Sequence, residues 1–152
     1  MTTFREVVKE VPSIADAFEP GLRALHARDR ARILAPEPRR LRGSVDLDEA
    51  LRVDRPGENR WDYIIGLSAG EAERAIFVEV HPASTSDVAT MLRKLQWLKE
   101  WLRGEGAALR ALRDSRPYRW VASGKVVIRP GTPQARRLAS SGLAFPVREL
   151  EL

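Results

Sequence analysis

Two acidic residues lie within apolar segments of the sequence, where a charged side chain is costly to bury. Asp62 belongs to residues 61–67 and Glu79 to residues 75–81. A buried carboxylate requires an ion partner, hydrogen bonds or a metal ion. Both segments have the length and composition of strands, and a turn separates them, so we expect the two carboxylates to share one site.

Each acid also has a structural alternative. Asp62 could be a strand-end residue that accepts hydrogen bonds from the backbone or from Arg60, and Glu79 could form a partly buried ion pair with an arginine. His81 lies two positions after Glu79 and therefore on the same face of the strand. A hydrogen-bonded structural histidine is the alternative to a functional one there.

The composition limits the class of protein. A chain of 152 residues with 43% hydrophobic and 31% charged residues is typical of one globular domain, here residues 1–152. Residues 1–12 have the composition of a flexible N-terminal arm. Neither a membrane-spanning run nor a signal peptide is indicated, so we expect a cytoplasmic protein without a membrane partner.

The chain contains no cysteine and two histidines, which excludes disulfides and thiolate metal sites. We therefore expect no zinc, and no haem or nucleotide cofactor. A metal at the two carboxylates would be a hard ion that prefers oxygen ligands, such as Mg²⁺ or Mn²⁺.

The net charge of +5 permits a nucleic-acid partner without requiring one. Arginine dominates the basic residues, a bias that genomic base composition also produces. The simplest interpretation of Arg28, Arg30, Arg32 and the pair 136–137 is a set of solvated helix faces, with phosphate contact as the alternative.

The expected fold is α/β (α+β), a central mixed sheet flanked by helices in the order α-β-β-β-α-β-α-β. Hydrophobic periodicity, capping residues and turns predict the elements. The first half contains helical patterns over 13–34 and strands over 39–45, 61–67 and 74–81. A long helix after 84–87 and a short helix over 107–112 follow. The last elements are a strand over 118–128, which Ser123-Gly124 could break into a hairpin, a helix over 133–142 and a strand over 145–150. Residues 44–51 could instead begin a short helix with Ser44 or Asp46 as its cap.

The long helix has a wide apolar stripe that includes Trp97 and Trp101. Core packing or a partner interface is favoured over base stacking for this pair. A homodimer or a protein partner that docks on this helix is therefore a candidate assembly. Upstream, residues 46, 48 and 49 form an acidic cluster, for which a helix N-terminus is the favoured explanation and metal ligation the alternative.

This arrangement of elements and acids resembles the PD-(D/E)XK (restriction-endonuclease-like) nuclease superfamily. The resemblance rests on Asp62 and on Glu79-Val80-His81, with 16 residues between the acids, and it covers about residues 13–128. It implies a divalent metal held by Asp62 and Glu79. His81 stands where the family has lysine and would assist the attacking water. Lys94 or Lys125 would supply a relocated amine.

Two hypotheses of function follow from the resemblance. The first is a metal-dependent nuclease that hydrolyses phosphodiester bonds in DNA or RNA, with Asp62, Glu79, His81 and Lys94 as its catalytic residues. The second is a catalytically degenerate member of the fold that binds nucleic acid or protein. A small-molecule enzyme that uses His81 and Glu79 as an acid–base pair is a third alternative.

Overall fold

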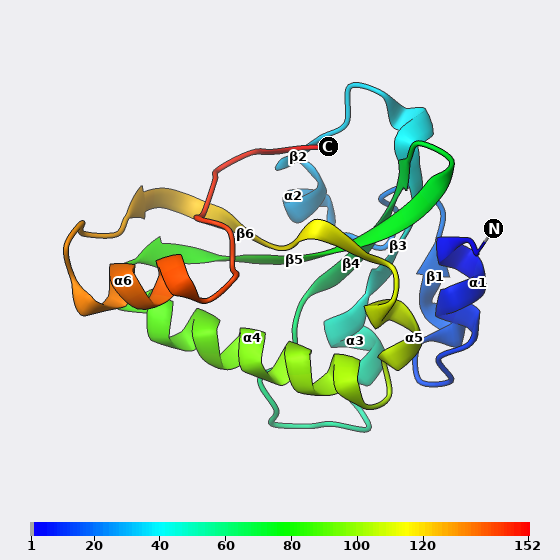
Figure 1. The fold of residues 1–152 in the computed structure, drawn as a ribbon, viewed down its shortest axis with the longest axis horizontal. Helices are drawn as coiled ribbons and strands as arrows, with labels where there is room; N and C mark the ends of the chain where they lie inside the picture. Colours follow the sequence, from blue (N-terminus) through cyan, green and yellow to red (C-terminus); the bar gives the residue numbers. More distant parts are fainter. Residues whose placement is uncertain (1) are drawn as a thin grey trace.

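The computed structural model describes residues 2–152 and contains a five-stranded mixed sheet (Figure 1). The strand order is β1-β3-β4-β5-β6, in which β5 and β6 are parallel and the other neighbours are antiparallel. The strands are β1 (Phe18–Glu19), β3 (Leu41–Asp46), β4 (Tyr63–Ala69), β5 (Ala72–Ser84) and β6 (Arg113–Val127). A second, parallel sheet pairs β2 (Ile33–Leu34) with β7 (Leu150–Glu151). The predicted α+β class with a mixed sheet is confirmed.

Five helices contribute to the core on one face of the large sheet, which we call the helix face. They are α1 (Phe4–Lys9), α3 (Leu47–Leu51), α4 (Asp87–Arg103), α5 (Ala107–Arg110) and α6 (Pro133–Ser140). The predicted apolar stripe of α4 provides the largest helical contribution, since Val88, Met91, Leu95 and Leu98 are all buried. Figure 1 shows α4 and α6 on the same side of the strands.

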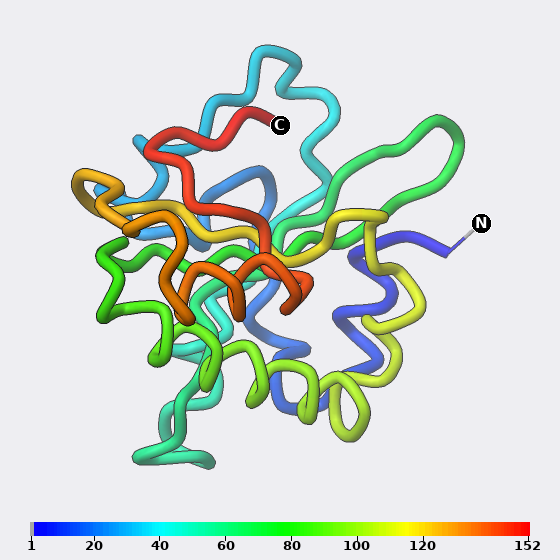
Figure 2. Tube along the Cα trace, turned by 60° about the vertical axis from the view of Figure 1, so that its left-hand side comes forward, coloured from blue at the N-terminus to red at the C-terminus, as the bar shows by residue number. Residues whose placement is uncertain are grey.

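The opposite face, which we call the loop face, has little regular structure over it. Residues 20–34, including the single-turn helix α2 (Ala27–Arg30), cover it together with residues 147–152. Leu25, Ile33 and Leu150 pack there against sheet residues such as Ile76 and Val78. Figure 2 shows the C-terminal segment beside the segment of residues 20–34, far apart as they are in sequence.

The N-terminal segment differs from its prediction. Residues 4–9 form α1, capped by Thr3, and Phe4, Val7 and Val8 are buried, so the predicted flexible arm over 1–12 is wrong for these residues. A side chain at Gly66 of β4 would overlap the ring of Phe4, so the glycine permits the close approach of α1 to the sheet. Residue 1 lies outside the described part.

Residues 13–34 do not form the predicted helices. They contain a 3-10 turn (Ala15–Ala17), β1, α2 and β2 instead. Pro20-Gly21 interrupts the apolar pattern, and Gly21 has a φ of 56°. The residues that follow are held by hydrogen bonds to Ser44 and Tyr63 of the sheet. Farther on, β6 is one continuous strand rather than a hairpin, and the predicted closing strand is reduced to β7. A second 3-10 turn spans Pro38–Arg40.

The hairpin of β4 and β5 positions the two acidic residues. Its register pairs Tyr63 with Val78, which places Asp62, the residue before β4, opposite Glu79 of β5. The chain then crosses through α4 and returns as β6, parallel to β5. Within residues 2–152, no helix is both long and apolar enough to cross a membrane.

Candidate functional site

The side chain of each acid, Asp62 and Glu79, accepts a hydrogen bond from the backbone of the other acid's segment. The backbone N–H of Asp62 donates to Glu79 Oε1 at 3.0 Å, and the N–H of Val80 donates to Asp62 Oδ2 at 3.0 Å. The predicted proximity of the two acids is therefore observed. The structural alternative for Asp62 is met in part, since it accepts a backbone hydrogen bond, whereas Arg60 pairs with Asp48 instead.

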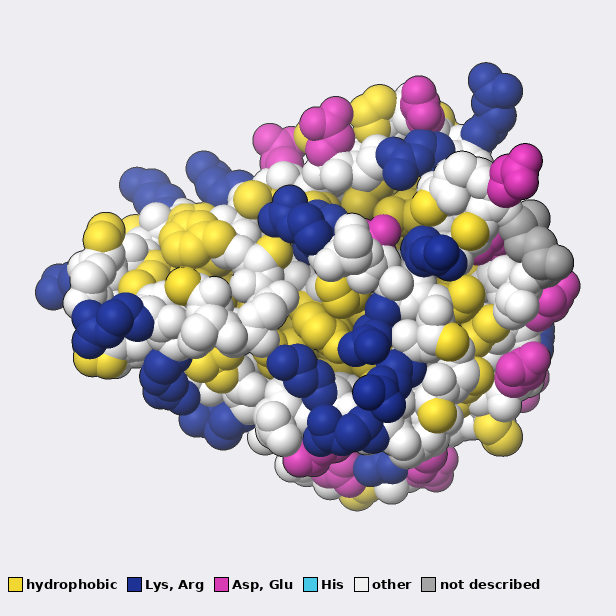
Figure 3. Space-filling view, viewed as in Figure 1, with side chains coloured by type: hydrophobic (Ala, Val, Ile, Leu, Met, Phe, Trp, Pro, Cys, Tyr) yellow, Lys and Arg dark blue, Asp and Glu magenta, His cyan; other side chains and the backbone are white. Residues whose placement is uncertain are grey.

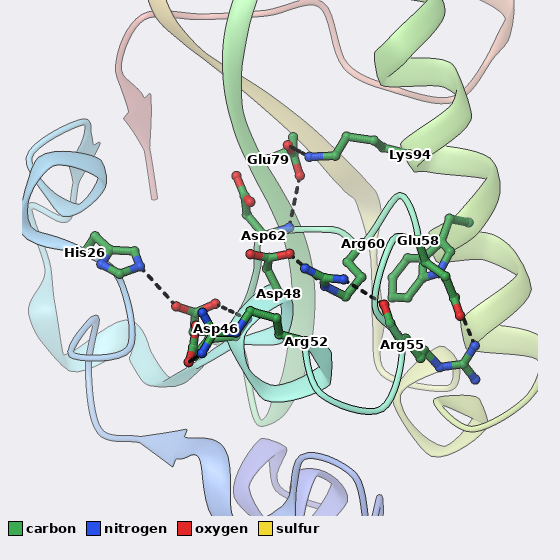
Figure 4. A network of polar contacts seen from close by, with 12 residues as sticks. His26, Asp46, Asp48, Arg52, Arg55, Glu58, Arg60, Asp62, Glu79 and Lys94 are labelled. Carbon is green, nitrogen blue, oxygen red and sulfur yellow. Dashed lines mark hydrogen bonds and ion pairs between the residues drawn. The ribbon is translucent and has the colours of Figure 1, made fainter.

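Lys94 completes this group from the helix face. It lies on α4 among buried residues of the apolar stripe, and its Nζ contacts Glu79 Oε2 (Figure 4). The partner of Glu79 is thus a lysine, not one of the many arginines. The other amine considered, Lys125, is exposed on β6. The side chains of Asp62, Glu79 and Lys94 together form what we call the carboxylate site.

Burial determines the electrostatics of the carboxylate site. Glu79 is 1% exposed. Burial and the negative charge of Asp62 raise the pKa of Glu79 to about 8, and the positive charge of Lys94 only partly opposes them. Burial likewise raises the pKa of Asp62 to about 6, while Lys94 lowers it. Both carboxyl groups therefore hold a proton to higher pH than they would in water, whereas a bound cation would favour the doubly ionised form.

His81 is on the same strand as Glu79 but has other partners. Its Nδ1 lies 2.9 Å from the carbonyl oxygen of Pro82 and 3.9 Å from Asp87 Oδ1 at the start of α4. Asp87 also accepts a hydrogen bond from the Ser84 hydroxyl. Within residues 2–152, His81 forms no hydrogen bond or ion pair with Asp62 or Glu79. Its direct part in the site remains a prediction.

The acidic cluster of residues 46, 48 and 49 lies at the N-terminus of α3, which is the explanation that the sequence favoured. Asp46 caps α3 by accepting the N–H of Glu49 at 2.9 Å, and it also lies 3.4 Å from His26 Nε2. Asp48 pairs with Arg60 at 3.0 Å (Figure 4). The N–H of Asp48 donates to the carbonyl oxygen of Asp62 at 3.3 Å, and the charge of Asp48 adds to the raised pKa of Asp62.

The two tryptophans of α4 have different environments. Trp101 is 3% exposed, whereas Trp97 is partly buried, and their rings stack with centroids 6.3 Å apart. Trp97 Nε1 donates to Glu58 at 2.7 Å and Trp101 Nε1 to Glu105 at 3.3 Å. Core packing accounts for Trp101. Docking of a partner or of a second copy at this helix stays a prediction.

The donor atoms of the site are compatible with a hard divalent cation. Carboxylate oxygens are the ligands that Mg²⁺ and Mn²⁺ prefer, and Mg²⁺ usually binds through one or two carboxylates together with water and substrate phosphates. In the part of the chain described, no group of three or more acidic, histidine or cysteine side chains is placed to hold a metal. Asp62 and Glu79 would therefore hold the ion as a pair, with Asp62 Oδ1 as the oxygen that forms no hydrogen bond within the described residues.

The sequence did not indicate the residues that approach Asp62 from the loop face. The Tyr63 hydroxyl donates to Asp29 Oδ2 at 2.5 Å, which anchors α2 beside the start of β4. Burial is the main cause of the raised pKa of Asp62, and the charges of Asp48 and Asp29 add to it. The helical interpretation of residues 22–34 concealed this contact. The only available signal was the presence of an acid near the middle of an otherwise basic segment.

Comparisons with protein-family models, with curated proteins and with solved structures found no match to this chain.

Proposed function

We propose that the protein is a metal-dependent nuclease whose active centre is the carboxylate site. The observation that carries the proposal is the meeting of two carboxylates from adjacent strands with a lysine from the next helix. Buried ionisable groups with perturbed pKa values, held together by position, are typical of catalytic centres. The resemblance to PD-(D/E)XK nucleases supports the same chemistry.

In this proposal Asp62 and Glu79 hold Mg²⁺ or Mn²⁺. The cation supplies charge stabilisation for the phosphate and lowers the pKa of a bound water. Lys94 keeps a positive charge beside Glu79, which favours the ionised carboxylate and is placed to stabilise negative charge on a phosphate oxygen. This role transfers the family's lysine function from position 81 to position 94.

The first test combines metal binding with cleavage. Mn²⁺ is titrated calorimetrically into the wild-type protein and the Glu79→Gln variant, above the pKa of Glu79. Labelled DNA and RNA are then incubated with each protein and Mg²⁺ or Mn²⁺. We expect saturable binding that Glu79→Gln abolishes, and a loss of cleavage of about 10²-fold or more in Glu79→Gln and Lys94→Met.

Matched controls are available on the same elements. Glu71→Gln changes an exposed acid in the β4–β5 turn, and Lys125→Met changes an exposed lysine of β6. Both should retain wild-type binding and cleavage. Cleavage that persists unchanged in Glu79→Gln, or wild-type protein that neither binds Mn²⁺ nor cleaves, would refute the proposal.

A second candidate is a catalytically degenerate nuclease-fold protein that binds nucleic acid or protein. The observation in its favour is that both oxygens of Glu79 and one oxygen of Asp62 already have partners within the fold. In that case Asp62 and Glu79 serve only to connect β4, β5 and α4. Glu79→Gln would then leave metal binding absent as in the wild type, and would change only the stability of the protein.

A further inference from the structure

A basic pocket of about 540 Å³ lies on the loop face and opens to solvent. Arg28, Ala31, Arg32, Arg148 and Glu149 line it. The three arginines and one glutamate give it a formal charge of +2. None of the three arginines forms an ion pair within residues 2–152, although the chain contains 21 acidic residues. The pocket therefore contains positive charge that the fold does not neutralise.

Arg32 is held in place by groups that carry no net charge. Its Nη1 donates to the carbonyl oxygen of Ala122 at 3.3 Å and its Nη2 to that of Ser123 at 2.9 Å. Its Nε is buried and has no hydrogen-bond partner among residues 2–152. Carbonyl oxygens orient the guanidinium but leave its charge available, so it is pre-organised for an anion.

Two hydrogen bonds connect the elements that line this pocket to the strands of the carboxylate site, with the pocket on the loop face and Lys94 on the helix face of the same sheet. Asp29, the neighbour of Arg28, accepts the hydrogen bond from Tyr63, the residue after Asp62. On the other side, Ala122 of β6, which holds Arg32, pairs in register with His81, two residues beyond Glu79.

The chemistry of the pocket selects its ligand. Arginine guanidinium groups bind phosphate oxygens in a paired geometry, and phosphate contacts of this kind position nucleic acids without reading their sequence. Figure 3 shows Lys and Arg spread over the middle and the left-hand margin of one face of the molecule, with Asp and Glu mainly toward its other margins. General basicity is thus widespread, whereas the pocket combines a concave shape with a fixed guanidinium.

We infer that the Arg28–Arg32–Arg148 pocket binds a backbone phosphate of a nucleic-acid strand and positions that strand for the carboxylate site. This inference rests on the proposed function for its choice of ligand. DNA and RNA share the phosphate chemistry, so both are probed.

The test measures binding separately from cleavage. Fluorescence anisotropy of short labelled DNA and RNA strands is recorded over a salt series in the presence of a chelator. We compare the wild type with Arg28→Ala/Arg148→Ala, which spares the structurally bound Arg32. The control, Arg39→Ala/Arg137→Ala, removes the same charge from two exposed positions outside the pocket. Thermal melts verify that all three proteins are folded.

We expect the pocket variant to bind about tenfold or more weakly, and its slope of log K against log salt to fall by ~1.4, or ~0.7 for each lost single-strand contact. The control should change affinity less than about twofold. Equal losses in both variants, or no binding of either strand by the wild type, would overturn the inference. Tight binding of inorganic phosphate with unchanged strand affinity in the pocket variant would overturn it as well.

The outcomes separate this inference from the proposed function. Binding that depends on the pocket, in a protein that cleaves neither DNA nor RNA, would support the inference and refute the nuclease. Cleavage that depends on Glu79, with equal strand affinity in the pocket and control variants, would support the nuclease and overturn the inference.

Discussion

The two faces of the sheet are built by different means. The helix face is covered by regular helices whose side chains form the larger apolar core, and an ion pair joins the buried Glu79 to Lys94 there. On the loop face, short segments are attached by individual polar contacts, such as Tyr63 to Asp29 and Ser44 to the N–H of Ala24. One face is thus held mainly by apolar packing of helices, and the other mainly by individual polar contacts of short segments.

The largest effect should come from a cavity in the helix face. Leu98 is fully buried on α4, and Leu98→Ala should lower the free energy of unfolding by about 3–4 kcal/mol, because the surrounding helices leave little room for collapse. Leu25→Ala on the loop face should cost about 2 kcal/mol, since short segments relax more readily. Urea denaturation measures both. An equal or larger loss for Leu25→Ala would contradict the proposed difference between the faces.

A smaller effect should follow from removing one polar attachment of the loop face. Tyr63→Phe deletes the hydroxyl that donates to Asp29 and accepts the N–H of His26, so we expect a loss of about 1–3 kcal/mol. Hydrogen exchange should accelerate first in residues 20–34, while α4 keeps its protection. Tyr118→Phe is the control, because that hydroxyl accepts one hydrogen bond, from the exposed Arg113, within residues 2–152. Uniform acceleration across both faces would show that the loop face does not open separately.

The last effect is a slope in the pH dependence of stability, which accumulates over several pH units instead of arising at a single pH. The folded protein holds protons on Glu79 and Asp62 up to pKa values of about 8 and about 6, above the ordinary values of 4.5 and 3.8. Between these limits the unfolded chain binds fewer protons, so stability falls as pH rises, by up to ~1.4 kcal/mol per pH unit for each retained proton. Below the ordinary values both states are protonated and this contribution is constant.

Glu79→Gln should reduce that slope between about pH 5 and pH 8, as measured by urea denaturation at each pH. Glu105→Gln serves as the control, because hydrogen bonding and ion pairing with Arg55 lower the pKa of Glu105. Its contribution has the opposite sign, and is lost as pH falls through the lowered pKa. An unchanged slope in Glu79→Gln would mean that Glu79 is ionised in the folded protein throughout this range.

The two faces also differ in how far the sequence predicted them. The strands around Asp62 and Glu79, the long helix and the Asp46 cap follow local rules of periodicity and capping, and they are found. Lys94 was a candidate because the resemblance to PD-(D/E)XK nucleases implies a relocated amine, which the helix after the second acid could supply. Its contact with Glu79 could not be derived, since the rotation of α4 over the sheet is set by packing.

The structure of the loop face was predicted wrongly from the sequence, and the reason is physical. Leu22, Leu25 and Ile33 recur at helical spacing, but the apolar contacts that they make are with the sheet and with Leu150, not along a helix. Conversely, Phe4, Val7 and Val8 are too few to stand out as a helix in sequence, and packing against the sheet stabilises α1. His81 shows the same limit, because the identity of its partners depends on where α4 begins.

The small β2–β7 sheet has a consequence for the order of folding. Ile33 pairs with Leu150 although more than a hundred residues separate them, whereas β4 and β5 are joined by a tight turn at Gly70. Contacts between distant residues close large loops and tend to form late. The hairpin that carries Asp62 and Glu79 can therefore assemble early. The arginine pocket between residues 28 and 148 cannot form before residue 148 has been synthesised.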